Sequence, residues 1–424
     1  MDYRLGLEFA VQQDRGDPLA HWRDHFHIPR RADGADELYL CGNSLGLQPK
    51  RTPSYVLEEL QKWQQLGVRG HVESCHPWVP YHEFLAENTA VLVGAQPREV
   101  VTMNSLTVNL HLMMVSFYRP SAERHKILIE EHAFPSDRYA VESQLRFHGL
   151  DPAQPLLLAR PRPGEAGLRM EDLVQLIEHQ GPAIALILLP GVQYYTGQVL
   201  DMAEITRLGH AKGCVVGFDL AHAAGNIPLR LHEWGCDFAC WCTYKYLNSG
   251  PGSVAGCFVH ERHVERAELP RFAGWWGHDK ATRFQMGPEF KPIASAEGWQ
   301  ISNPPILSLA AIRASLEIFR EAGGMGPLRE KSIWLTGYLE FLLQALLADR
   351  IAIITPRDPA QRGCQLSLKV KTRQIEGRIL FEGLAAAGVS CDWREPDVIR
   401  AAPVPLYNRF EDVYRFVEIL KASF

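Results

Sequence analysis

CDFACWCTYKYLNSGPGSVAGCFVH, residues 236–260, decides the fold of this chain when it is read together with CVVGFDLAH, residues 214–222. Each stretch begins with a short apolar run that is typical of a buried strand. Asp219 closes the first run. Lys245 follows the second run and lies 26 positions after Asp219. The carboxyl ends of parallel strands lie along one edge of a sheet, where such folds bind their ligands. We therefore expect Asp219 and Lys245 to lie close together.

This pair of residues predicts a site for pyridoxal phosphate. A lysine amine beside a strand end can form a Schiff base with an aldehyde cofactor. A carboxylate on the neighbouring strand can pair with the pyridine nitrogen and keep it protonated. For either residue alone, a surface lysine or a helix-capping aspartate is the simpler interpretation. The two together, each at a strand end, favour the cofactor site.

The surrounding sequence extends the sheet. KILIEE (126–131), AIALILLP (183–190) and SVAGCFV (253–259) are further strand candidates, and DMAEITRLGHAKG (201–213) predicts a helix that ends at Gly213. The alternation of strands and helices indicates an α/β fold with a mostly parallel sheet. Polar residues follow four of the strands, at 134–137, 193–196, 219–222 and 243–245. We expect these four clusters to converge.

Breaks in the pattern divide the chain into three parts. Residues 1–50 are expected to be an arm that packs on the small domain, 51–305 the large cofactor domain, and 306–424 a smaller α+β C-terminal domain. Within the large domain, TPSYVLEELQKWQQL (52–66) predicts an amphipathic helix with Val56, Leu60 and Trp63 on one face. In the small domain, helices are expected near 307–319 and 334–347, followed by a strand QLSLKV (365–370) and a final helix.

Composition excludes several classes of protein. The 424 residues carry a net charge of −5 with no basic block, so no nucleic-acid partner is expected. No apolar run reaches membrane-spanning length, and the N-terminus has no apolar signal core, so we expect a cytoplasmic protein without a membrane partner. Nine irregularly spaced cysteines suit free thiols in a reducing compartment. Cys236, Cys240 and Cys242 alternate along a strand, which favours packing over a metal site, and no metal is expected.

The start of a predicted helix offers a site for the cofactor phosphate. Asn104 and Ser105 precede an apolar stretch, so the free N–H groups and positive dipole at Leu106 and Thr107 could bind an anion. An ordinary helix cap is the alternative. Phe134 follows a strand and could stack on the pyridine ring, although an aromatic residue there is also common in a core.

Eight motifs together resemble the kynureninase family of fold-type I pyridoxal phosphate hydrolases. In chain order they are CGNSLGLQP (41–49), FPSD (134–137), YYTGQ (194–198), FDLAHAAG (218–225), YKYLNSGPG (244–252), GWWGH (274–278), ISNPPI (301–306) and IRAAPVPLYN (399–408). The resemblance implies the fold-type I transferase architecture, with a mostly parallel seven-stranded sheet and helices on both faces. It also implies pyridoxal 5'-phosphate as the cofactor.

The resemblance further implies roles for individual residues. Lys245 would bind the cofactor covalently, and the other implied cofactor contacts are Asp219 at the pyridine nitrogen, Phe134 on the ring, Leu106, Thr107 and Tyr244 at the phosphate, and His222 and Asp137 along the cavity. Trp275 and Asn303 match contacts that arrive from the partner subunit, which implies a homodimer with shared active sites. Where some relatives carry a serine, this chain has Pro190 or Gly191, so a hydroxyl contact is lost there.

The implied substrate is an amino acid with an aryl ketone side chain. Arg400 offers a planar fork to the α-carboxylate, with a structural ion pair as the alternative. His71, Ser302 and Asn303 match positions in the aryl pocket. The implied reaction hydrolyses the Cβ–Cγ bond of L-kynurenine or L-3-hydroxykynurenine, giving L-alanine and anthranilate or its 3-hydroxy form, in tryptophan degradation or NAD biosynthesis. Tyr244 is a candidate proton carrier, with phosphate binding as an equal alternative.

Other enzymes on the same fold are competing interpretations. Cys391 lies where cysteine desulfurases carry their nucleophile, but the segment before Arg400 is short and has no glycine-rich mobile loop. An aminotransferase is a further alternative. A binding protein without catalytic activity would be expected to lose Lys245, which this chain retains.

Overall fold

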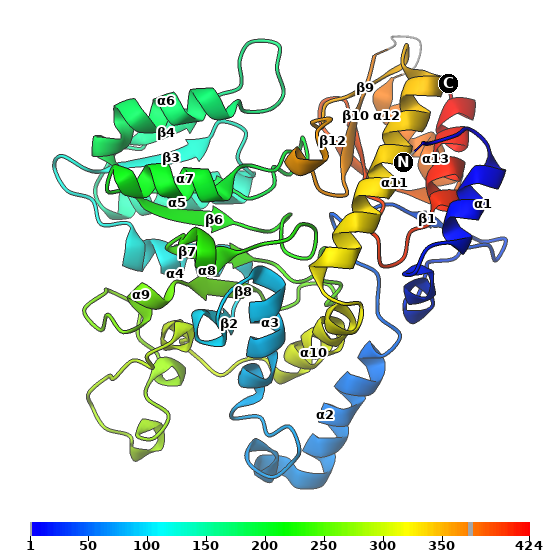
Figure 1. The fold of residues 1–424 in the computed structure, drawn as a ribbon. Coiled ribbons are helices and arrows are strands. Elements are labelled where there is room, and N and C mark those ends of the chain that lie inside the picture. Colours follow the sequence, from blue (N-terminus) through cyan, green and yellow to red (C-terminus); the bar gives the residue numbers. More distant parts are fainter. Residues whose placement is uncertain (1, 372–375) are drawn as a thin grey trace.

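The computed structural model describes residues 2–371 and 376–424. In these residues a seven-stranded sheet forms the centre of the large domain, with strand order β2-β8-β7-β6-β5-β3-β4 (Figure 1). Its strands are β2 (Val100–Thr102), β3 (Lys126–Glu130), β4 (Leu156–Ala159), β5 (Ile184–Pro190), β6 (Val215–Asp219), β7 (Phe238–Trp241) and β8 (Gly256–Val259). Strands β4, β3, β5, β6 and β7 run parallel, and β8 runs antiparallel to both β7 and β2. The prediction of a mostly parallel sheet is confirmed.

Helices cover both faces of this sheet, as predicted. The helices between residues 86 and 264 are α3 (Ala86–Val93), α4 (Leu106–Phe117), α5 (Pro135–Phe147), α6 (Met170–Gln180), α7 (Met202–Ala211), α8 (Leu231–Trp234) and α9 (Glu261–Val264), and α2 (Thr52–Leu66) precedes them. One core cluster joins α4 and α5 to the sheet, through residues such as Met113 and Val141. A second cluster lies on the opposite face and includes Ile177 of α6 and Ile205 of α7.

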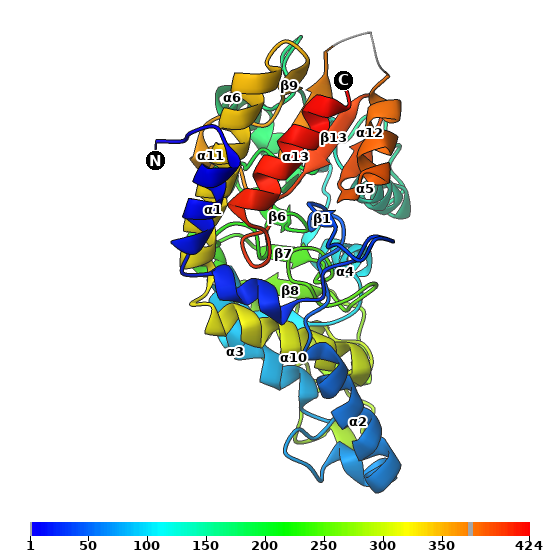
Figure 2. The same cartoon turned by 90° about the vertical axis from the view of Figure 1, so that its right-hand side faces the viewer.

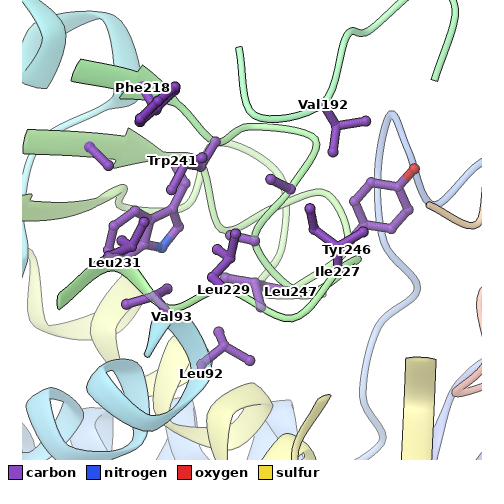
Figure 3. Close-up of a cluster of buried hydrophobic side chains, with 14 of the residues drawn as sticks. Leu92, Val93, Val192, Phe218, Ile227, Leu229, Leu231, Trp241, Tyr246 and Leu247 are labelled. Atoms are coloured by element: carbon purple, nitrogen blue, oxygen red, sulfur yellow. The ribbon is translucent and has the colours of Figure 1, made fainter. Parts of the chain in front are cut away.

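The core of the second face fills the space between the sheet, α3 and the loops that follow β6 (Figure 3). Trp241 of β7 and Phe218 of β6 lie there with Val93 and Leu231, and each of the four is at most 1% exposed. The indole of Trp241 occupies the place where a side chain on β8 would project, because a Cβ built on Gly256 would come within 2.1 Å of it. Glycine at this position lets the two strands pair beneath a large ring.

The small domain contains a four-stranded antiparallel sheet with strand order β12-β13-β10-β9. The elements from residue 306 onward are α10 (Ile306–Glu321), α11 (Met325–Leu347), β9 (Ile351–Ile353), β10 (Leu366–Val370), α12 (Gly377–Ala386), β11 (Val389–Ser390), β12 (Asp392–Arg394), β13 (Val398–Ala401) and α13 (Phe410–Ala422), of which α10 packs with the core of the large domain. The N-terminal segment lies against this domain: α1 (Leu7–Arg15) packs beside α13, and β1 (Leu38–Tyr39) pairs with β11 (Figure 2).

Helix α2 has the predicted bounds, but two residues of its apolar face are exposed. Trp63 is 65% and Leu60 38% exposed, whereas Glu59 and Lys62 are buried. The charged residues are buried because they satisfy each other and the loop: Glu59 Oε2 accepts hydrogen bonds from Lys62 Nζ at 2.6 Å and from Trp78 Nε1 at 2.8 Å. The apolar side of α2 is therefore left uncovered within one chain, on a part of the molecule that extends away from both sheets (Figures 1 and 2).

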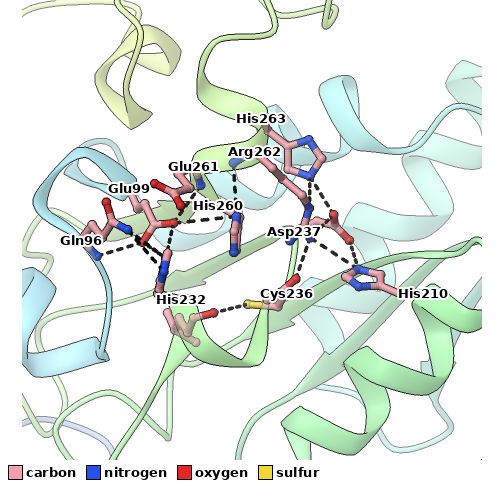
Figure 4. A network of polar contacts seen from close by, with 12 residues as sticks. Gln96, Glu99, His210, His232, Cys236, Asp237, His260, Glu261, Arg262 and His263 are labelled. Atoms are coloured by element: carbon pink, nitrogen blue, oxygen red, sulfur yellow. Dashed lines mark hydrogen bonds and ion pairs between the residues drawn. The ribbon is translucent and has the colours of Figure 1, made fainter.

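A polar network surrounds Asp237 at the amino-terminal end of β7 (Figure 4). Asp237, immediately before β7, is 4% exposed and accepts hydrogen bonds from His210, His263, Arg262 and the backbone N–H of Val216, at 2.6–2.9 Å. These contacts offset the cost of burying its charge. In the described part of the chain, none of the helices is both long enough and apolar enough to cross a bilayer.

Candidate active site

A cavity of about 340 Å³ lies at the carboxyl ends of β3, β5, β6 and β7. The four polar clusters predicted from the sequence all contribute to its wall, through residues that include Asp137, Tyr194, Asp219 and Lys245. They converge because four neighbouring parallel strands end at the same edge. The convergence predicted from the sequence is therefore confirmed.

Lys245 lies in a tight turn after β7 that is fixed from several sides. The N–H of Asn248 donates to the Lys245 carbonyl at 3.0 Å, and Asn248 adopts a positive φ of 56°. The N–H of Gly46 donates to the carbonyl of Tyr244 at 2.8 Å. A Cβ on Gly46 would come within 2.3 Å of the Lys245 carbonyl oxygen, so only glycine allows this close approach. The N-terminal segment thus helps to hold the lysine turn.

The amine of Lys245 faces a histidine and an aromatic ring. Its Nζ lies 2.9 Å from His222 Nε2 and 6.0 Å from the centroid of the Phe134 ring. Burial, followed by the charge of Lys245, holds the pKa of His222 well below its usual value. His222 is therefore neutral and can accept a hydrogen bond at Nε2. Its Nδ1 atom is buried without a hydrogen-bond partner among the described residues.

Three carboxyl groups line the deep part of the cavity. Asp219 is 6% exposed, and its Oδ1 accepts the N–H of Ala221 at 2.7 Å. Burial and the neighbouring charge of Asp219 raise the pKa of Asp137 well above its usual value. Burial likewise raises the pKa of Glu130 to about 7, although Gln193 donates to this carboxyl at 3.0 Å.

The N-terminus of α4 forms another part of the wall. Its cap residue, Ser105, makes no side-chain hydrogen bond to the helix, so the first N–H groups stay available. The hydroxyls of Thr107 and Ser136 lie 2.8 Å apart, and both residues line the cavity with Leu106. Tyr244 lines it as well, and burial raises the pKa of its hydroxyl, so this group stays protonated. The wall offers hydrogen-bond donors suited to a phosphate.

The residues present fit pyridoxal 5'-phosphate. An amine, an aspartate side chain and a donor-rich helix N-terminus line one cavity, and these groups match the aldehyde, the pyridine nitrogen and the phosphate of that molecule. The unpartnered Nδ1 of buried His222 shows that the polar interior is not fully satisfied by the protein alone.

Arg400 is placed differently from the expectation. It lies on β13, is fully buried, and is absent from the cavity wall in the described structure. Its Nε and Nη2 contact Asp392 at 3.1 and 2.8 Å, and its Nη1 donates to the carbonyl of Tyr194 at 2.6 Å. The ion pair that the sequence left as an alternative is present, and Arg394 reaches the cavity instead.

Four predicted residues lie outside the cavity of their own chain. His71 packs edge-on against Trp78, with ring centroids 5.3 Å apart, and Trp275 lines a separate hollow with residues of the 278–290 segment. Ser302 and Asn303 are exposed. In the part of the chain that the structure describes, none of these four lines the cavity with Lys245.

Several residues of the wall were not predicted from the sequence. They include Asn43, Ser44, Ser105, Glu130, Pro190 and Arg394. Asn43 Nδ2 donates a hydrogen bond to Gln365 Oε1 at 3.0 Å. Because Gln365 immediately precedes β10, this bond connects the N-terminal segment to the small domain. The motif CGNSLGLQP contains Asn43 and was a signal for it, but a motif alone does not say which of its side chains faces a ligand.

Comparisons with known proteins agree with this geometry. A family model described as the kynureninase C-terminal domain matches residues 328–420. The kynureninase of Koribacter versatilis is 62% identical over 98% of this chain and 97% of its own length. The kynureninase of Myxococcus xanthus is 58% identical over 97% of this chain and 96% of its own.

Solved structures agree on the fold. The cysteine desulfurase of Thermococcus onnurineus superposes with a TM-score of 0.75 over 100% of this chain and 99% of its own, at 17% identity. This likeness shows a shared fold-type I architecture. The full-length identity to the two curated relatives goes further, and it shows that this chain belongs to the kynureninase family.

Proposed function

We propose that this chain is a hydrolase of carbon–carbon bonds that cleaves the Cβ–Cγ bond of L-kynurenine and L-3-hydroxykynurenine with pyridoxal 5'-phosphate. Water is consumed, and the products are L-alanine and anthranilate or 3-hydroxyanthranilate. The observation that carries the proposal is the single cavity that contains Lys245, Asp219 and the N-terminus of α4 in a chain of this family. Tryptophan degradation or NAD biosynthesis is the corresponding pathway role.

The roles of the cavity residues follow from their surroundings. When bound, pyridoxal phosphate supplies an electron-withdrawing ring that stabilises negative charge on the substrate carbon. The Lys245 amine binds the aldehyde and then moves a proton at the substrate's α-carbon. Asp219 holds the pyridine nitrogen protonated, and the neutral His222 accepts a hydrogen bond beside the lysine. Phe134, whose ring centroid lies 6.0 Å from the Lys245 amine, would stack on the pyridine ring.

Phosphate binding and proton transfer use the other wall. The N–H groups of Leu106 and Thr107 hold the phosphate, and Asp137 remains protonated so that it can donate a hydrogen bond. The Tyr244 hydroxyl is protonated too and can donate to the phosphate or carry a proton in the later steps. Arg400 holds the α-carboxylate of the substrate, for which its contact with Asp392 must be shared.

We propose a homodimer in which each active site uses residues of both subunits. Trp275, Asn303, Ser302 and His71 lie outside the cavity of their own chain, as expected for residues that complete the partner's site. The uncovered side of α2, where Trp63 is 65% exposed, is an apolar surface of the kind that a second subunit buries. Trp275 and Asn303 then contact the cofactor, and Ser302, Asn303 and His71 the aryl ring.

We also propose the division of the chain at 50 and 305, and a cytoplasmic location. The small domain has a core cluster of its own, which includes Ala10 and Leu40 of the N-terminal segment, and α1 packs on α13. Helix α10 packs instead with the core of the large domain. All nine cysteines are free thiols, which suits a reducing compartment.

The cysteine desulfurase alternative finds little support at its key residue. Cys391 is 8% exposed, and burial raises the pKa of its thiol. A nucleophilic cysteine needs an accessible thiolate. Cys391 packs in the core of the small domain instead.

The proposal is tested with the purified holoenzyme and both substrates. L-Kynurenine and L-3-hydroxykynurenine are each incubated with it, and alanine and the aromatic amine are quantified. Equimolar alanine and aromatic amine are expected. Release of sulfur from cysteine with no alanine from either kynurenine would contradict the proposal and favour a desulfurase.

A further inference from the structure

Two arginines of the small domain share one aspartate beside the cavity. Asp392 Oδ1 and Oδ2 lie 3.0 and 3.2 Å from Nε and Nη2 of Arg394, and the same carboxylate contacts Arg400. The two cations and one anion leave a net charge of +1 in this cluster. An excess positive charge at the edge of a partly closed cavity attracts anions.

The pairing of β12 and β13 explains how the three residues meet. Asp392 is the direct register partner of Arg400 across the two strands. Arg394 follows Asp392 by two positions, so both side chains project from the same face of β12. In the four-stranded sheet, β12 is the edge strand, on the side that faces the large domain (Figure 1). The sequence DWR therefore places Asp392 beside Arg400 and Arg394 in the cavity wall.

The two arginines differ in exposure and in the number of contacts that their guanidinium groups already make. Arg400 is fully buried, and each of its three nitrogens already contacts Asp392 or the Tyr194 carbonyl. Arg394 keeps 35% of its side chain exposed and lines the same cavity as Lys245. An incoming anion can therefore reach the exposed part of Arg394 from the cavity while Arg394 stays paired with Asp392.

We infer that Arg394 is a second residue that recognises the α-carboxylate of the substrate, and that Asp392 is the positioning residue that holds its guanidinium at the cavity. The inference rests on the proposed function for the nature of the substrate. Arg394 provides the exposed charge for the first contact, and Asp392 also keeps Arg400 in the orientation from which it can share that carboxylate.

The test compares two small ligands that differ only in the carboxylate. L-Alanine and L-alaninamide are titrated into the holoenzyme, and binding is followed by the absorbance of the bound cofactor. In Arg394→Gln, the preference for alanine over alaninamide should fall by about tenfold or more, because a charge-assisted hydrogen bond is lost. KM for kynurenine should rise by a similar factor, with kcat changing less. A purely structural role would weaken both ligands equally, and that result would overturn the inference.

Control variants distinguish the effect of losing the Arg394 charge from nonspecific structural effects of a substitution. Arg378→Gln removes an arginine of the same domain whose partner, Glu382 at 3.0 Å, is on the surface, and it should leave the preference unchanged. Arg394→Lys keeps the charge, so its preference should lie between those of the wild type and Arg394→Gln. A lysine variant as poor as the glutamine variant would contradict the inference. If the wild type fails to cleave kynurenine, the proposed function is wrong, while the two alanine ligands still decide the role of Arg394.

Discussion

Replacing Asp237 by asparagine should destabilise the large domain without touching the cavity. The change keeps the shape of the side chain but removes the charge that His210, His263 and Arg262 contact at 2.6–2.9 Å (Figure 4). Removing one partner from a buried ion pair costs about 3–5 kcal/mol. The side chains of His210 and Arg262 are 35% and 36% exposed and can be partly rehydrated, which favours the lower end, about 3 kcal/mol.

Urea unfolding followed by circular dichroism measures this cost. With a slope of about 3 kcal/mol per molar urea, a loss of about 3 kcal/mol moves the midpoint down by about 1 M. Asp172→Asn is the matched control, because Asp172 forms a two-point pair with Arg162 at 2.7 Å on the surface. The urea midpoint of this variant should equal that of the wild type. A shift below about 0.3 M for Asp237→Asn would refute the reasoning.

The difference in unfolding free energy between the wild type and Asp237→Asn should also depend on pH. The hydrogen bonds and the charge of Arg262 hold the pKa of Asp237 below its usual value, despite its burial. A depressed carboxyl pKa contributes stability that is complete above the unfolded value of about 3.9 and is lost as the pH falls toward the folded value. The difference in unfolding free energy between the wild type and the variant should therefore stay constant from neutral pH to about 4 and decrease only below pH 4.

The remaining predictions concern the active site. Lys245→Ala should abolish turnover while the fold survives, and unchanged turnover would invalidate the assignment. Arg400→Lys should raise KM by about tenfold, because a point charge replaces a planar fork; kinetics within about twofold of wild type would make Arg400 structural. Mixed Lys245→Ala and Trp275→Ala subunits should regain about a quarter of wild-type activity, since half the dimers are hybrids with one intact site; no recovery despite subunit exchange would mean unshared sites. The enzyme should prefer 3-hydroxykynurenine over kynurenine in kcat/KM, and the preference should collapse in His71→Ala; a ratio near one would refute it.

The central sheet was predictable because its strands are buried on both faces and therefore appear as continuous apolar runs. Their polar end residues were predictable for the same reason, since parallel strands end together. Strands β2 and β4 were not predicted, because VVT and LLLA are too short to show a period. Arg394 was missed because DWR is a three-residue strand whose direction is set only by its pairing with β13.

The burial of α2 shows a different limit of sequence reasoning. Its 3.6-residue pattern correctly predicted the helix and its apolar face, but Trp63 of that face is exposed and Glu59 is buried. Glu59 is buried because Lys62 and Trp78, at separations of 3 and 19 residues, satisfy its carboxylate. Apolar periodicity predicts that a surface will be covered, and it does not predict whether the cover comes from the same chain.

The wall of the cavity joins the two ends of the chain, with Asn43 on one side and Arg394 on the other. A ribosome makes the first of these residues long before the last, and domains fold as they emerge. The large domain can therefore acquire its sheet and its lysine turn while the pocket still lacks one wall. Stable binding of pyridoxal 5'-phosphate therefore requires a nascent chain that is almost complete. A shortage of this cofactor during synthesis should leave a folded large domain without cofactor rather than an unfolded polypeptide.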